Sequence, residues 1–216
     1  MEGGAVRRGG RPTRREAAAL GDKILDAGTA LFLSRGFGAT SIEAIARRAR
    51  ISKRTFYHRF ADKAELYRAV VQRLLQRWLP PFEAALDTPA ALDDLLLRSA
   101  QHMLEVALSP EALALRRLLL AEAERFPELV EIAIEQGATR GVERIADLLD
   151  AECRAGHIAL TDCRFAAMQF QEMVLAIPLR RAIGFGTPMT AAEREVWIGQ
   201  CVGLLIHGCR TQPHGG

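Results

Sequence analysis

The feature that most restricts the fold is a pair of short helical patterns, separated by a three-residue turn, in the N-terminal third of the chain. The first pattern covers about Ser41–Arg50, and Thr40 and Glu43 have the S/T-x-x-E spacing of a capping box at its start. The second covers Lys53 to about Phe60, and Ser52 can cap it. Two short helices joined by such a turn form the helix-turn-helix unit. The sequence therefore predicts a small helical domain built around this unit.

The rest of the chain also carries helical patterns, and no stretch has the alternation of a strand. Hydrophobic residues make up 49% of the sequence but aromatic residues only 6%, and the helix formers Ala, Leu, Glu and Arg are abundant. Further helices are predicted at residues 16–35, from Lys63 toward Pro80-Pro81, and at 89–108, 111–125, 127–155, 162–184 and 191–210. We therefore expect an all-α protein.

Charge is distributed unevenly along the chain. Residues 1–70 contain 15 Lys and Arg against 7 Asp and Glu, whereas residues 71–216 contain 14 against 19. This asymmetry is typical of a nucleic-acid-binding head on a more acidic body. Residues 1–15 hold five arginines among glycines without any periodicity, so we interpret them as a disordered basic arm. The alternative is a tail that only increases solubility.

The second short helix has two faces of different chemistry. Phe56 and Phe60 are four residues apart and share one face, so both should anchor the helix in the domain core. Cations and hydroxyl groups occupy the opposite arc, together with an outward Tyr57: Lys53, Arg54, Thr55 and His58. Such side chains suit contacts with phosphates and base edges. The alternative is the solvated face of an ordinary helix, but the caps, the turn and the positive charge agree on DNA binding.

The segment "ALFLSRGFGATSIEAIARRARISKRTFYHRFADKAELY" resembles the N-terminal domain of the tetracycline-repressor (TetR) family of bacterial transcription regulators. The resemblance is specific over about residues 16–70. Beyond Val70 the resemblance is one of architecture only: the remainder resembles the all-helical body of the AefR-like subgroup. It implies a disordered arm at 1–15, a helix-turn-helix domain at 16–62, and a helical ligand-binding and dimerisation domain at 63–212.

The resemblance also implies roles for single residues. Thr40 and Ser41 would contact backbone phosphate. Lys53, Arg54, Thr55 and Tyr57 would face base edges and nearby phosphates, and His58 and Lys63 would hold the DNA backbone. The sequence departs from the family pattern at Arg50, where glycine is usual, and at Arg59, where histidine or tyrosine is more frequent. Either Arg50 adopts a left-handed backbone or the turn differs.

The family mechanism implied is a homodimer that binds a palindromic operator in double-stranded DNA and is released by a small molecule, most often as a repressor. Helices 162–184 and 191–210 would form a four-helix interface, in which Gly199-x-x-x-Gly203 allows close approach. An apolar or aromatic ligand is expected in the body. The candidate ligand-binding residues, each also a candidate for ordinary core, are Trp78, His102, Met103, Phe126, Phe170 and Met173.

Other classes of function find less support in the sequence. No phosphate-binding loop, metal-ligand pair or nucleophile motif is present, so we expect no catalytic residue, no metal and no cofactor. An all-helical enzyme and a ligand-independent or activating DNA-binding protein remain as alternatives. No segment resembles a signal peptide or a membrane span, which predicts a cytoplasmic protein. The four cysteines, expected as buried thiols with a redox sensor as the alternative, are Cys153, Cys163, Cys201 and Cys209.

Overall fold

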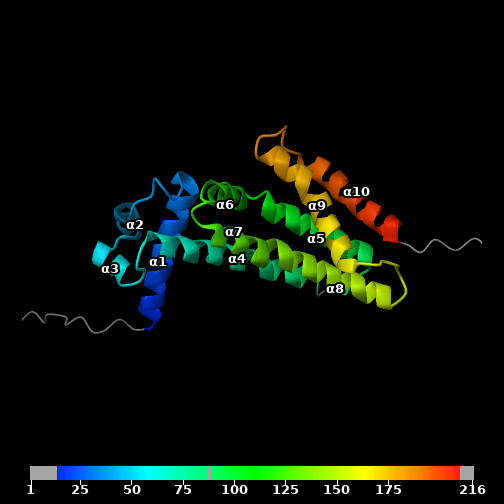
Figure 1. Cartoon of the computed structure of the whole chain (residues 1–216), viewed down its shortest axis with the longest axis horizontal. Helices are drawn as coiled ribbons and strands as arrows, with labels where there is room; N and C mark the ends of the chain where they lie inside the picture. Colours follow the sequence, from blue (N-terminus) through cyan, green and yellow to red (C-terminus); the bar gives the residue numbers. More distant parts are fainter. Residues whose placement is uncertain (1–13, 87–88, 210–216) are drawn as a thin grey trace, which may run out of the picture. The chain divides into compact units, whose positions relative to one another are not determined.

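The computed structural model describes residues 14–86 and 89–209, and every regular element in this part of the chain is a helix (Figure 1). This confirms the predicted all-α class. The chain divides into two compact units, residues 1–70 and 71–216. The helices are α1 (Arg14–Arg35), α2 (Ile42–Ala49), α3 (Lys53–Tyr57), α4 (Lys63–Leu86), α5 (Leu92–Ala107), α6 (Pro110–Ala121), α7 (Pro127–Ala133), the π-helix η1 (Ile134–Thr139), α8 (Arg140–Arg154), α9 (Cys163–Ala182) and α10 (Ala191–Cys209).

The first unit has an aromatic core to which the beginning of α4 contributes. The ring centroid of Phe32 lies 5.8 Å from that of Phe37 and 5.4 Å from that of Tyr67, and the Phe37 and Tyr67 centroids are 5.2 Å apart. All three side chains are buried, as are Leu66 and Val70. The predicted domain boundary after residue 62 is therefore too early, because the first unit takes its core from α4 as far as Val70.

The second unit is organised around α9, which packs against α5, α8 and α10. These four helices enclose one cluster of buried apolar side chains, which burial stabilises by removing them from water. Its most buried members are Leu96, Ala100, Leu104, Ile145, Leu149, Ala167, Phe170 and Val174.

A proline inside α9 changes how two helices are joined. Pro178 is buried in the helix interior and has no backbone N–H, so the usual bond to the carbonyl of Val174 cannot form. The indole Nε1 of Trp197, from α10, donates to that carbonyl at 3.1 Å. One turn further along α10, the Cys201 thiol donates to the carbonyl of Met173 at 3.5 Å. Side chains of α10 thus reach the backbone of α9 at two successive carbonyls.

The helix predicted at 127–155 consists of α7, η1 and α8 in direct succession. η1 is a π-helical segment, in which the backbone bonds skip one more residue than in an α-helix. Such segments occur frequently at functional sites. This one contributes to the cavity described below.

Several predicted boundaries differ from those observed. α4 does not end at Pro80-Pro81 but runs through both prolines to Leu86, since the fixed φ of proline is compatible with a helix even though its ladder bond is lost. α3 ends at Tyr57 rather than near Phe60. Arg14 and Arg15 begin α1, which shortens the predicted arm, and residues 1–13 of that arm lie outside the described part of the chain.

Candidate nucleic-acid interface and cavity

The turn between α2 and α3 is fixed by a serine before each helix and a left-handed residue between them. Ser41 accepts a bond from the Ala44 N–H at 3.2 Å, and Ser52 accepts one from the Thr55 N–H at 3.1 Å. Arg50 has φ 56° and ψ 48°, the left-handed conformation, so the first of the two expected alternatives for this residue is correct. The cap of α2 is Ser41, one residue later than predicted.

Replacing Arg50 by glycine is expected to stabilise the first unit by about 0.5–1 kcal/mol. A left-handed backbone costs a non-glycine residue on the order of 1–2 kcal/mol, part of which is offset by the greater freedom of glycine in the unfolded chain. Native-state hydrogen exchange of the α1–α3 amides measures the change as slower exchange. The matched control, Arg47→Gly, lies inside α2 and should act in the opposite direction by about 1 kcal/mol. Faster exchange in Arg50→Gly would contradict the role given to the turn.

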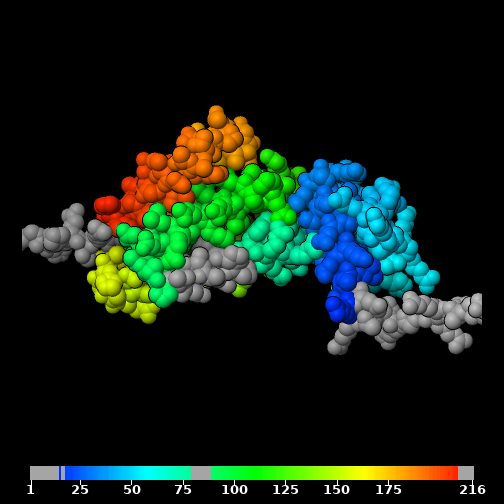
Figure 2. All heavy atoms as spheres, turned by 180° about the vertical axis from the view of Figure 1, so that it is seen from behind, coloured from blue at the N-terminus to red at the C-terminus, as the bar shows by residue number. Residues whose placement is uncertain are grey.

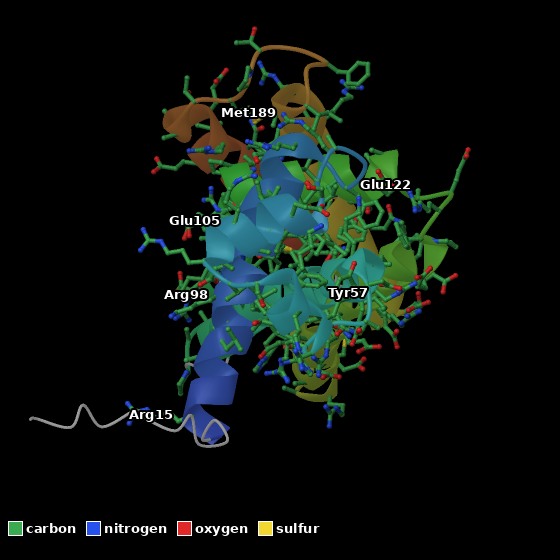
Figure 3. All side chains as sticks on the ribbon, turned by 90° about the vertical axis from the view of Figure 1, so that its left-hand side faces the viewer. Arg15, Tyr57, Arg98, Glu105, Glu122 and Met189 are labelled. Carbon is green, nitrogen blue, oxygen red and sulfur yellow. The ribbon has the colours of Figure 1, made fainter. Side chains whose placement is uncertain are left out.

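Neighbouring residues of α3 point to opposite sides, as predicted. Phe56 is fully buried, and its ring centroid is 5.9 Å from that of Phe60. Tyr57, labelled in Figure 3, is 54% exposed. Exposed basic side chains flank it along α3 and the residues after it: Lys53, Arg54, His58 and Arg59. The ring of Phe56 therefore anchors the helix in the core, and the ring of Tyr57 faces solvent.

An ion pair joins the two helices at the edge of this face. Lys53 of α3 pairs with Glu43 of α2, and both side chains are more than half exposed. The hydrogen bond from Lys53 lowers the pKa of Glu43, and the same bond raises the pKa of Lys53. A phosphate that approaches Lys53 therefore has to compete with Glu43. Because Lys53 and Glu43 are both in contact with water, breaking their ion pair costs little.

Two of the predicted phosphate contacts are used inside the domain. Thr40 is only 2% exposed, and its hydroxyl donates to the carbonyl of Gly36 at 2.7 Å. Lys63 is half-buried, and its ammonium donates to the carbonyls of Phe37 and Thr40, each at 2.7 Å. The phosphate contacts of Thr40 and Lys63 stay predictions, because in the structure both side chains close the loop between α1 and α2.

The other predicted residues are accessible to different degrees. Ser41 is exposed, with its oxygen engaged in the cap, and Thr55 is half-buried with its hydroxyl 2.8 Å from the Ser52 hydroxyl. The prediction omitted Arg47 and Arg48, which are exposed in the last turn of α2. The signal for them is visible in the sequence, since two adjacent arginines follow the inward Ile45 and Ala46 of the same helix. The accessible basic face thus extends over both helices.

A cavity of about 380 Å³ lies within the second unit. Its volume falls in the range of roughly 300–1,000 Å³ that is usual for small-molecule sites. Its wall is largely apolar and is built from α4, α5, α6, α7, η1, the start of α8 and α9. The polar lining residues are Trp78, His102, Arg116, Gln136 and Gln171.

The predicted ligand-binding residues divide into two groups. Trp78, His102 and Met103 line the cavity. Phe126, Phe170 and Met173 do not: Phe126 and Phe170 are buried, and Phe170 and Met173 belong to the packed core around α9. For these three the ligand-binding role stays a prediction that this cavity does not support, since rings and a thioether at helical spacing fit a core as well as a cavity. Gln171, one residue from Phe170, was missed.

The thiols follow the expectation of buried cysteines in part. Cys163 and Cys201 are buried and Cys153 is half-buried, while the side chain of Cys209 lies outside the description. The Cys153 and Cys163 sulfur atoms are 3.6 Å apart. Burial, with hydrogen bonds to Asp150 and Cys153, raises the pKa of Cys163 to about 12, and burial also raises the pKa of Cys201. Both therefore have little thiolate character at neutral pH.

Residues 14–86 and 89–209 contain neither a metal-binding cluster nor a membrane-spanning helix. No group of three or more His, Cys, Asp or Glu side chains in this part of the chain is arranged to hold a metal ion. None of its helices combines the length and apolar character that a membrane crossing requires.

Sequence models of two families match the chain. Residues 24–70 match "Bacterial regulatory proteins, tetR family", and residues 94–207 match "AefR-like transcriptional repressor, C-terminal domain". The first match covers the two short helices and their turn. The second covers most of the described second unit, including much of the cavity wall.

Two characterised relatives are similar over part of their length. The HTH-type transcriptional activator FasR of Mycolicibacterium smegmatis is 38% identical over 85 residues, which is 39% of this chain and 37% of that protein. The HTH-type transcriptional regulator RutR of Escherichia coli K12 is 37% identical over 84 residues, 39% of each chain. The matched region is therefore less than two fifths of either relative.

Solved structures are similar over nearly the whole chain. A protein described as a TetR-family transcriptional regulator from Mesorhizobium loti is 30% identical, with a TM-score of 0.83 over 93% of this chain and 100% of that one. The flavonoid-responsive regulator FrrA is 25% identical, with a TM-score of 0.76 over 91% of this chain and 100% of that one.

Proposed function

The chain belongs to the TetR family of bacterial regulatory proteins, and we propose that it is a sequence-specific DNA-binding transcriptional regulator that a small molecule releases from its operator. The observation that carries this proposal is the exposed basic face of α2 and α3 around Tyr57, held by buried Phe56. We further propose that the protein acts in the cytoplasm and that regulation, without catalysis, is its whole activity.

Fluorescence anisotropy tests DNA binding directly. The purified protein is titrated into its own upstream intergenic DNA and into a scrambled duplex of the same length, at fixed physiological salt. A regulator should prefer the native fragment by a factor on the order of a thousand or more. Equal affinity for both duplexes would favour an architectural DNA-binding protein, and no binding to either would overturn the proposal.

Replacing Tyr57 by alanine is expected to weaken operator binding by about tenfold or more without unfolding the first unit. A side chain in contact with a base edge or phosphate contributes about 1–3 kcal/mol, and the 54% exposure of Tyr57 limits the effect on stability. Operator anisotropy and far-ultraviolet circular dichroism measure the two effects. The control, Tyr57→Phe, separates the ring from the hydroxyl. Loss of helical signal in Tyr57→Ala would show that the residue is structural.

We propose that α9 and α10 form the interface of a homodimer. The end of α9 and α10 lie at the surface of the second unit, in orange to red in Figure 2. They expose apolar side chains that a monomer rarely leaves in water: Phe165, Met168, Val196 and Leu204. A Cβ at Gly199 would meet no atom within 4 Å, so this part of α10 is open to a neighbour. The two reading heads must then lie about 34–36 Å apart, or a multiple of this, on a palindrome.

Replacing Leu204 by aspartate is expected to convert the dimer to a monomer at micromolar concentration. An unpaired charge buried in an apolar interface costs several kcal/mol, so dissociation should be favoured by about a hundredfold or more. Sedimentation velocity measures the change. Leu120→Asp is a matched control, because Leu120 is 65% exposed against 68% for Leu204 but lies on α6. Dimers in Leu204→Asp would place the interface elsewhere.

We propose that the cavity of the second unit binds the releasing molecule. Such a ligand can act only by binding more tightly to the state that does not fit the operator. The largely apolar wall favours an apolar or aromatic compound, and a relative 25% identical is named as flavonoid-responsive. Repression is our first candidate because the body resembles AefR-like repressors, and activation is the second because FasR is named an activator. A reporter gene placed under the upstream DNA and expressed with and without the protein shows whether the protein represses or activates transcription.

A further inference from the structure

The cavity contains one polar side chain that is deeply buried. Gln171 of α9 is 8% exposed and lines the cavity, whereas the other polar lining residues are half-buried or exposed. The Gln171 amide is not among the fully enclosed polar atoms of the described residues that lack a partner, so its nitrogen and oxygen stay reachable from the cavity. An amide on a largely apolar wall gains a hydrogen bond when a molecule in the cavity offers a polar group to it.

The chemistry of the wall restricts what that molecule can be. Among the described lining residues none is acidic, and Arg116 is the one Lys or Arg. Arg116 is exposed, so its charge is in contact with water. An amide offers both an N–H donor and a carbonyl acceptor, and carries no charge to compensate an ion. The group that meets Gln171 should therefore be neutral.

The accessible side of the cavity is apolar. Leu120 of α6 is 65% exposed and Ile134 of η1 is 55% exposed, and both line the cavity. Exposed apolar side chains at a cavity offer a favourable first contact to an apolar body that leaves water. The volume of about 380 Å³ is at the small end for ligand sites, which limits that body to a few rings.

We propose that Gln171 determines the ligand specificity of the cavity, which takes a neutral molecule with an apolar body of two or three rings and a hydroxyl or carbonyl group that hydrogen-bonds the Gln171 amide. The inference rests on the proposed function of the cavity as the effector site. It goes beyond that function in naming the recognition residue and the polar group that it selects.

A pair of matched probes tests the selection. 4-Phenylphenol and 4-methylbiphenyl have the same two rings and differ in a hydroxyl against a methyl group. Both are measured by displacement of the neutral fluorophore N-phenyl-1-naphthylamine from the full-length protein. Gln171→Leu should weaken the binding of 4-phenylphenol by about tenfold, the effect of one neutral hydrogen bond. The binding of 4-methylbiphenyl should stay unchanged or become tighter. Gln101→Leu, exposed on α5 and outside the cavity lining, should change neither.

The remaining outcomes each decide the inference. A second variant, Gln171→Met, preserves side-chain length and should reproduce the selective loss if Gln171→Leu fails to fold. Equal effects on both probes, which a trapped water or a packing role of Gln171 would produce, overturn the proposal. So does a wild-type protein from which neither probe displaces the fluorophore. Operator anisotropy on the same preparation separates the two proposals. If the protein binds DNA but does not discriminate between the probes, the proposed regulatory function stands and the inference about Gln171 fails. If it discriminates between the probes but does not bind DNA, the inference stands and the regulatory function fails.

Discussion

Replacing Phe56 by alanine is expected to lower the free energy of unfolding of the first unit by about 3–5 kcal/mol, the usual cost of removing a buried phenylalanine. Phe56 is fully buried, and its ring contacts those of Tyr57 and Phe60, with centroids 5.6 and 5.9 Å away. It is the main apolar anchor of a five-residue helix that is too short to be stable alone. Its loss should therefore free α3 as well as leave a cavity.

Native-state hydrogen exchange of the full chain measures this effect unit by unit. Amides of α1–α3 should exchange at least about a hundredfold faster in Phe56→Ala, while those of α8 in the second unit remain as in the wild type. Phe56→Leu, which retains most of the volume, should cost less than about 1.5 kcal/mol. Unchanged exchange in the alanine variant would contradict the core assignment of Phe56.

The second large effect is expected at Lys63, where methionine should destabilise the first unit by about 3 kcal/mol. Its ammonium donates to the carbonyls of Phe37 and Thr40 and lies 4.2 Å from the centroid of the Phe37 ring. Hydrogen bonds from charged donors contribute about 1.5–3 kcal/mol each, and the partial exposure of Lys63 places the sum at the lower end. Methionine keeps the apolar stem but leaves two carbonyls without this donor.

The control for Lys63 is Lys53, an exposed lysine of the same unit. Lys53→Met removes the surface ion pair with Glu43, which should change stability by no more than about 1 kcal/mol. Operator binding is measured in parallel, since Lys53 belongs to the exposed basic face. A Lys63→Met protein as stable as the wild type, but deficient in operator binding, would restore the phosphate-contacting role that its sequence position suggested.

Much of the head could be predicted because its signals are local. The four-residue spacing of Phe56 and Phe60 places both on one face, and Tyr57 then has to point away. The position of the turn could be predicted as well, but whether Arg50 is left-handed stayed one of two alternatives until its φ of 56° and ψ of 48° were known. These assignments depend on helix geometry, which neighbouring residues determine.

The errors have a common cause in tertiary structure. Thr40 and Ser41 are both good caps, and the choice between them depends on the bond from Thr40 to the distant end of α1. A lysine at a helix start is equally compatible with DNA and with loop carbonyls. In the body, the spacing of Phe170 and Met173 marks an apolar helix but cannot say which face meets a cavity. A lone buried glutamine such as Gln171 has no periodic signal at all.

The proline of α9 has a consequence for the order in which the second unit forms. The carbonyl of Val174 cannot accept the usual bond from four residues on because Pro178 lacks an N–H, and Trp197 of α10 donates to it instead. The middle of α9 therefore completes its backbone bonding only after a segment some twenty residues later in the chain has docked. A local backbone bond has thus been exchanged for one between residues 23 positions apart, so we expect α9 and α10 to unfold together.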